Sequence, residues 1–136
     1  MKRLFISIIV VLFCFQLFAQ YNQGIKVETL LKTDTTTIGQ KINYPVFENA
    51  EVTICRITFP PGVSTGWHYH TIPVFAYVEK GTLTVEVKDK ETMTFSEGQT
   101  FSEVINVLHN GTNSGDVDVI LLAVYLGEKG KPLSEH

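Results

Sequence analysis

One stretch dominates the sequence: Gly62-Val63-Ser64-Thr65-Gly66-Trp67-His68-Tyr69-His70. Side chains two residues apart on an extended strand point to the same face, so His68 and His70 can reach one metal ion, while Trp67 and Tyr69 point away from it. The chain has four histidines, and His109 is the only other one before the last residue. Neutral imidazole is a ligand for Zn, Cu, Fe or Ni. His68, His70 and His109 are therefore the candidate ligands of one metal site.

Apolar and polar residues alternate on both sides of this stretch, with Gly, Pro and Asn between the alternating segments. Such alternation is typical of half-buried strands, and no segment after residue 19 has the sustained 3.6-residue period of a helix. The expected strands are 25–30, 35–44, 52–59, 68–70, 74–78, 82–87, 93–95, 100–105 and 117–126. About nine short strands predict an all-β sandwich or barrel, whose mouth or interior can hold a ligand.

The first residues have the features of a secretory signal peptide. Met1-Lys2-Arg3 is basic, residues 4–18 are apolar, and Ala19 is a small residue at the break. The apolar run is about 15 residues long, whereas a membrane-spanning helix needs roughly 20, so cleavage after Ala19 is favoured over an uncleaved anchor. We therefore expect a periplasmic or secreted protein, with residues 1–19 as the signal and no stable membrane anchor.

The remaining chain has the size of one domain, which we expect to span residues 20–126. Residues 127–136 contain two glycines, a proline and several charges, and we expect them to form a mobile tail. With Lys2 and Arg3 removed, 9 of the 11 basic residues remain against 14 acidic ones, a formal charge of −5. This acidic balance does not favour nucleic-acid binding. Cys55 is then the only cysteine, and we expect it to be a small core residue.

Two spaced motifs around the histidines resemble those of the cupin family. Gly62-x5-His68-x-His70-x3-Val74-x6-Gly81 resembles the first cupin motif, and Gly98-x5-Val104-x-Asn106-x2-His109-x3-Asn113 resembles the second. With the flanking strands, the resemblance covers essentially the whole chain after the signal. It implies a double-stranded β-helix, the jelly-roll barrel of cupins. It also implies that His68, His70 and His109 bind a divalent transition metal (Fe, Mn, Ni, Zn or Cu), and that the protein forms a homodimer.

The sequence departs from both motifs at positions that matter for function. The first motif usually has a glutamate ligand where this chain has Val74, whose apolar side chain cannot bind a metal. The second motif usually has proline and glycine where this chain has Val104 and Asn106. The three histidines carry over from the family, but the glutamate ligand does not.

Glu103 is the candidate replacement for that glutamate and the one candidate catalytic acid or base near the metal. It lies six residues before His109 and shares strand parity with Phe101, so it faces the interior if Phe101 does. A carboxylate buried there needs a metal, another cation or hydrogen bonds to offset its desolvation. Three roles stay open: a direct metal ligand, a residue that orients a ligand histidine, or a side chain that faces solvent.

Two functions fit these observations. The first is a metal-dependent enzyme that acts on a small organic molecule, as the cupin dioxygenases, isomerases and lyases do, with open metal positions for substrate or dioxygen. The second is a cupin that binds a small molecule or sugar without converting it, which the loss of the glutamate ligand favours. The fold does not decide between them, because function depends on the site. The sequence slightly favours the enzyme.

Overall fold

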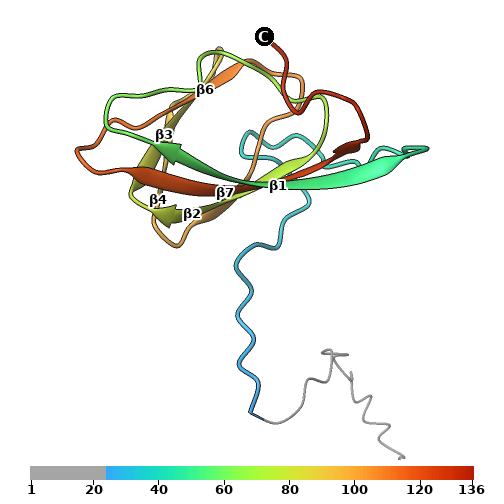
Figure 1. The fold of residues 1–136 in the computed structure, drawn as a ribbon, viewed down its shortest axis with the longest axis horizontal. Coiled ribbons are helices and arrows are strands. Elements are labelled where there is room, and N and C mark those ends of the chain that lie inside the picture. The colour runs from blue at the N-terminus through green and yellow to red at the C-terminus, as the bar shows by residue number, and fades with distance from the viewer. Residues whose placement is uncertain (1–23) are drawn as a thin grey trace, which may run out of the picture.

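A computed structural model describes residues 24–136, so the expected signal peptide lies outside the described residues. Its strands are β1 (Ala50–Phe59), β2 (Val74–Lys80), β3 (Thr82–Val87), β4 (Met93–Ser96), β5 (Thr100–Ser102), β6 (His109–Thr112) and β7 (Val119–Glu128). They form a four-stranded sheet, β1-β7-β2-β5, and a three-stranded sheet, β4-β3-β6, arranged around a common interior (Figure 1). The described residues contain no helix, which confirms the all-β prediction.

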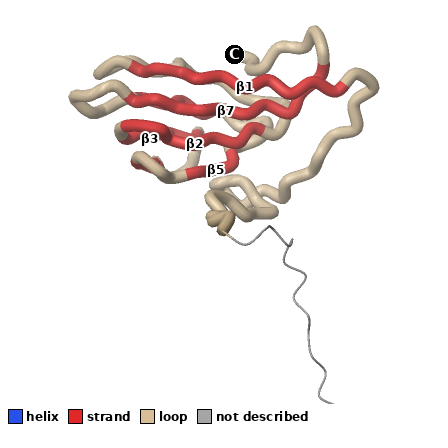
Figure 2. Tube along the Cα trace, turned by 60° about the horizontal axis from the view of Figure 1, so that its bottom comes forward, coloured by secondary structure: helices blue, strands red, loops and turns tan. Residues whose placement is uncertain are grey.

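The longest pairing in the fold joins β1 and β7, which run antiparallel from Ala50 opposite Glu128 to Phe59 opposite Val119. Both strands are rich in β-branched and aromatic residues, which fit a pleated and half-buried surface. β2 pairs with the other edge of β7, and β5 pairs with β2. The sheet therefore holds residues that are far apart in the sequence side by side, as Figure 2 shows for β1, β7, β2 and β5.

The core lies between the two sheets and takes alternate residues from each strand. Its main cluster consists of Phe59, Ala76, Val78, Leu83, Val85, Val87, Phe101, Val104, Val119 and Leu121. Cys55, expected in the core, is partly buried and packs against a second, smaller cluster that contains Ile72 and Val74. Truncation of a fully buried residue such as Leu83 to alanine would cost about 2–5 kcal/mol.

Two of the motif residues have structural roles in tight turns. Gly81 adopts a φ of +78°, and a Cβ at this position would lie 2.9 Å from the carbonyl oxygen of Asp118, so no larger residue fits without a shift. Asn113 is fully buried, and its amide nitrogen donates 2.7 Å hydrogen bonds to the carbonyls of Phe59 and Val117. These residues hold the connections at the ends of β1 and β7, next to the start of β3.

The outward face of the four-stranded sheet is apolar. Val52 and Ile54 are 61% and 62% exposed on β1. The facing residues on β7, Leu126 and Val124, are partly buried. Arg56, whose direction the sequence left open, also lies on this face, where it forms a bidentate ion pair with Glu79 (Nε to Oε2, 2.7 Å).

Two expected strands near the start of the described chain are wrong. Residues 25–30 form no strand, and residues 35–44 contribute only a single bridge between Thr35 and Lys41. A strand needs a hydrogen-bonding neighbour along its length, and within residues 24–136 none pairs with 25–30. Ile25 and Val27 remain 57% and 58% exposed despite their alternation. The expected strand 68–70 is also wrong, because these residues form only isolated bridges, whereas β6 was not among the expected strands.

The end of the chain lies against the body of the barrel. After β7, Glu135 forms an isolated antiparallel bridge with Tyr69, with two backbone hydrogen bonds of 2.9 Å. The mobility expected for residues 127–136 stays a prediction. Across residues 24–136, no helix is long and apolar enough to span a bilayer.

Candidate metal centre

The three candidate histidines lie together inside the barrel. One ligand nitrogen from each of His68, His70 and His109 falls within 4.8 Å of the others. His109 is the first residue of β6, and His68 pairs with it through backbone hydrogen bonds of 3.0 and 2.9 Å. His70 follows two residues later on the same extended segment, so its ring points to the same side. The structure therefore joins the two motifs at one cluster that is able to bind a metal ion.

A backbone carbonyl fixes the tautomer of each ring. The Nδ1 atoms donate to Gly66 (2.9 Å, His68), Leu133 (2.8 Å, His70) and Val107 (2.9 Å, His109). A carbonyl oxygen can only accept, so each Nδ1 carries the proton and each Nε2 presents its lone pair. Metal-binding histidines typically donate the hydrogen of their other ring nitrogen in this way.

His109 Nε2 shows most clearly that the residues fit a metal. This atom is buried, and among the described residues it has no hydrogen-bond partner. A buried polar atom without a partner costs about 1–3 kcal/mol, and a bound cation would remove that cost. The donor set, three neutral imidazoles, suits a first-row transition metal.

Glu103 lies with the histidines rather than in solvent. Its Oε2 is 3.6 Å from His109 Nε2, and its side chain is only 13% exposed. It follows directly after β5, where Phe101 is buried, so the parity expected from the sequence places both side chains inside. The structure thus leaves two of the three roles considered for Glu103, a direct ligand or a residue that orients one.

The interior favours the uncharged forms of Glu103, His70 and His109. Burial raises the pKa of the Glu103 carboxyl to about 7. Burial also lowers the pKa of His70 to about 4 and moves the pKa of His109 in the same direction, although their carbonyl hydrogen bonds oppose this. Burial therefore opposes an ion pair between Glu103 and His109 in the metal-free protein. A buried divalent cation would instead favour the ionised carboxylate.

The cavity beside the histidines is small, about 40 Å³. Its lining is mostly apolar, with residues such as Leu83, Val85 and Leu121 around the polar cluster, and no lysine or arginine among the described residues that form it. A cavity of this size holds a water molecule or a ligand of a few atoms.

Tyr125 is a site residue that sequence reasoning did not identify. It lines the same cavity, and its ring centroid lies 5.7 Å from that of His70. Burial raises the pKa of its hydroxyl to about 12, so the hydroxyl stays protonated and can donate a hydrogen bond. The available signal was strand parity with Leu121 and Ala123 in the last expected strand, whose side chains also face inward.

The motif departures have clear consequences in the structure. Val74 is 1% exposed and packs in the apolar cluster with Ile72 and Ala123, so it cannot contribute a ligand. Asn106 adopts a φ of +55°, the left-handed conformation that glycine usually supplies and that asparagine tolerates best among other residues. The turn before His109 is therefore kept without the glycine.

Comparison with known proteins agrees with this architecture. Residues 55–125 match the cupin domain model. The structure of an oxalate oxidase aligns at 21% identity with a TM-score of 0.51, covering 56% of this chain and 42% of that one. A predicted oxalate decarboxylase from Thermotoga maritima aligns at 25% identity with a TM-score of 0.50, covering 54% and 64%. The chain thus spans less than two thirds of either relative.

A cupin domain from Bordetella pertussis is similar over more of its length. It shares 22% identity with a TM-score of 0.50, and the alignment covers 71% of this chain and 97% of that one. No curated protein sequence matches the chain. These likenesses confirm the predicted jelly-roll fold.

Proposed function

We propose that this chain, which belongs to the cupin family, binds one divalent transition-metal ion through His68, His70 and His109 and acts with it on a small organic molecule. The observation that carries the proposal is that one ring nitrogen of each histidine lies within 4.8 Å of the others, while every Nδ1 donates to a backbone carbonyl. When bound, an ion such as Fe, Mn, Ni, Zn or Cu supplies Lewis-acid chemistry to a ligand oxygen.

The size of the cavity supports a small substrate. About 40 Å³ of space admits only a few non-hydrogen atoms, and the apolar lining excludes bulk water from them. The Tyr125 hydroxyl can donate a hydrogen bond to the substrate, and Glu103, if it is not itself a ligand, can take or give a proton. Small carboxylic acids are the first compounds to test, because one relative at 25% identity is described as a predicted oxalate decarboxylase.

The second candidate function is binding without conversion. Val74 in place of the usual glutamate supports it, because a site with three neutral ligands can hold an anionic molecule on the metal without an acid or base to transform it. The two candidates differ in what they require of Glu103. An enzyme uses its carboxylate at the reacting centre, whereas a binding protein tolerates its replacement.

Export from the cytoplasm is part of the proposal. The basic start, the apolar residues 4–18 and Ala19 support a signal peptide that is removed before Gln20. The intact mass of protein exported by a native host tests this. A mass that begins at Gln20 supports cleavage, and a mass that includes residues 1–19 contradicts it.

The functional test uses residues 20–136, loaded separately with each candidate metal and incubated with a panel of small carboxylic acids, phenols and sugars. Product formation is followed by NMR and compared with a His109→Ala variant and with Glu97→Gln, an exposed control. Conversion that requires His109 but not Glu97 supports the enzyme. Binding that requires His109 without conversion supports the second candidate, and retention of both in His109→Ala contradicts the proposed site.

A further inference from the structure

Residues 133–136 lie along the segment that carries His68 and His70, and we refer to them as the docking segment. Tyr69 and Glu135 exchange two backbone hydrogen bonds of 2.9 Å, and the Tyr69 hydroxyl donates to Glu135 Oε2 at 2.8 Å. His136 Nδ1 lies 3.2 Å from the carbonyl oxygen of Trp67. The docking segment therefore lies beside the segment that carries His68 and His70 and pairs with it through Tyr69, the residue between the two histidines.

The docking segment also contacts the metal site itself. His70 Nδ1 donates to the carbonyl of Leu133 at 2.8 Å, across a sequence separation of 63 residues. The matching bonds of His68 and His109 go to carbonyls only two residues away. Two of the three histidines are therefore oriented by their own segments, and the third is oriented by the docking segment.

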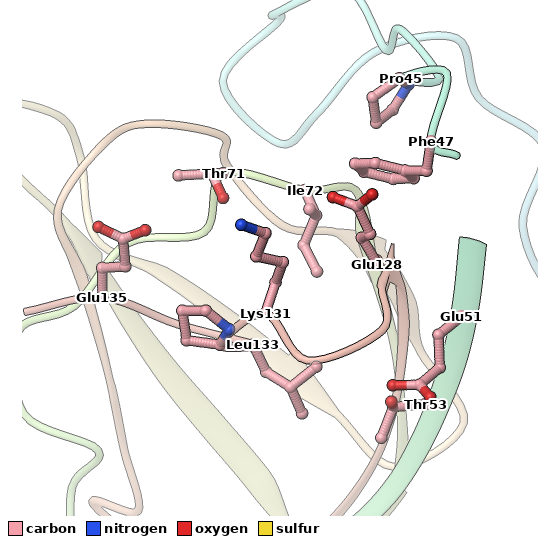
Figure 3. Close-up of a pocket in the computed structure, with 12 residues that line it drawn as sticks. Pro45, Phe47, Glu51, Thr53, Thr71, Ile72, Glu128, Lys131, Leu133 and Glu135 are labelled. Carbon is pink, nitrogen blue, oxygen red and sulfur yellow. The ribbon is translucent and has the colours of Figure 1, made fainter. Parts of the chain in front are cut away.

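The docking segment lies at the surface, with Leu133 and Ser134 half-buried and Glu135 and His136 exposed. The Leu133 side chain packs against the cluster that contains Ile72, Val74 and Tyr125. Leu133 and Glu135 also line a pocket of about 240 Å³, together with Thr71 and Phe47 (Figure 3). Because open space borders the segment, it can separate from the barrel without the loss of any pairing between the seven strands.

We propose that the docking segment completes the metal site: when it is docked, the Leu133 carbonyl holds the His70 ring in the orientation and tautomer that bind the metal. This inference rests on the proposed metal-binding function. When the segment separates, His70 loses its Nδ1 acceptor, and the metal loses a preoriented ligand. Since coupling between two binding events is reciprocal, a bound metal must favour the docked segment by the same factor.

The first test compares Zn²⁺ affinity, measured by competition with a chromophoric chelator, in residues 20–136 and in a chain that ends at Lys131. We expect the shortened chain to bind Zn²⁺ about 10–100-fold more weakly, the usual cost of losing a partner that orients a metal ligand. Lys131→Ala is the matched control, because its side chain lines the same pocket but, within residues 24–136, forms no hydrogen bond or ion pair with the segment that carries His68 and His70. Circular dichroism establishes that each variant is folded.

The second test keeps the chain intact and measures hydrogen exchange of the Glu135 amide, which donates to Tyr69. We expect Zn²⁺ to slow this exchange, and we expect Glu135→Pro, which lacks the amide, to weaken Zn²⁺ binding as the shortened chain does. Equal affinity in the full and shortened chains, or exchange unchanged by Zn²⁺, would overturn the docking inference and leave the proposed function intact. Failure of the full chain to take up any candidate metal would overturn both.

Discussion

The backbone amide of Glu103 donates a 2.9 Å hydrogen bond to the carbonyl oxygen of Val74. In the pairing of β2 with β5, Phe75 lies opposite Ser102 and Ala76 opposite Phe101, so Val74 and Glu103 form the next pair along. Opposite residues of an antiparallel pair share a face of the sheet. The carboxylate therefore enters the barrel from the strand next to the one on which cupins usually carry their glutamate.

The position of Glu103 suits a metal ligand. Two ligand atoms bound at about 2.1 Å to one tetrahedral ion lie about 3.4 Å apart. The observed separation between Glu103 Oε2 and His109 Nε2 is 3.6 Å. We therefore expect Glu103→Gln to weaken metal affinity by more than about 100-fold, measured by chelator competition. A loss of about 10–100-fold would indicate a residue that orients a ligand, and no loss beyond that of Glu97→Gln would contradict both roles.

In the metal-free protein the same substitution should stabilise the fold at alkaline pH. The pKa of Glu103 is about 7 in the folded protein, above its ordinary value of 4.5, so the free energy of unfolding falls as the pH rises from 4.5 to 7 and stays lower above pH 7. The difference between the folded and the ordinary pKa corresponds to a loss of up to about 3 kcal/mol in the free energy of unfolding at pH 8. We expect urea unfolding to show Glu103→Gln as the more stable protein at pH 8, with the difference absent at pH 4. A destabilised metal-free variant at pH 8 would show that the carboxylate has a stabilising partner.

His70 should make the stability of the fold depend on pH in the opposite direction. The folded pKa of His70 is about 4, below its ordinary 6.5, so the unfolded chain binds more protons between these values and stability falls as the pH drops from 6.5 to 4. In the wild-type protein, protonation of Glu103 as the pH falls from 7 to 4.5 stabilises the fold and offsets this loss of stability. The free energy of unfolding of metal-free Glu103→Gln should therefore fall by up to about 3 kcal/mol as the pH drops from 6.5 to 4. A flat profile in that variant would mean that His70 is solvated.

The outward face of the four-stranded sheet should mediate dimer formation. Val52 and Ile54 are more than half exposed there, beside Leu126 and Val124 on β7. A lysine at position 54 would bury a charge in the interface, so we expect Ile54→Lys to be monomeric where the wild type is a dimer, by light scattering at micromolar concentration. Thr94→Lys, at an exposed position of β4 in the other sheet, is the control. A monomeric wild type would contradict the expected homodimer.

Much of the fold could be predicted because its signals are local. Alternation in β1, β3 and β7 identifies strands whose neighbours exist, and turn residues such as Gly81 and Asn113 have steric and hydrogen-bonding requirements that few other residues meet. Residues 25–30 alternate equally well but have no strand beside them in the described chain. Alternation predicts which side chains of a strand would be buried, but it does not predict whether a neighbouring strand is present.

The site was predictable in part for the same reason. Motif spacing identified His68, His70 and His109, and parity with Phe101 placed Glu103 inside. The bond from His70 to Leu133 depends on a tertiary contact that no local pattern encodes, whereas parity with Leu121 and Ala123 could have placed Tyr125 inside. A short segment with glycine, proline and charges carries no local signal of the residue that it pairs with.

The metal content of purified residues 20–136, measured by elemental analysis after incubation with each candidate metal and removal of excess ion, tests the central claim most directly. We expect one ion per chain, a higher thermal midpoint when it is bound, and loss of the ion in both His70→Ala and His109→Ala. A chain that takes up no stoichiometric metal, or one that keeps its ion when His68, His70 and His109 are all replaced by alanine, would contradict the three-histidine site.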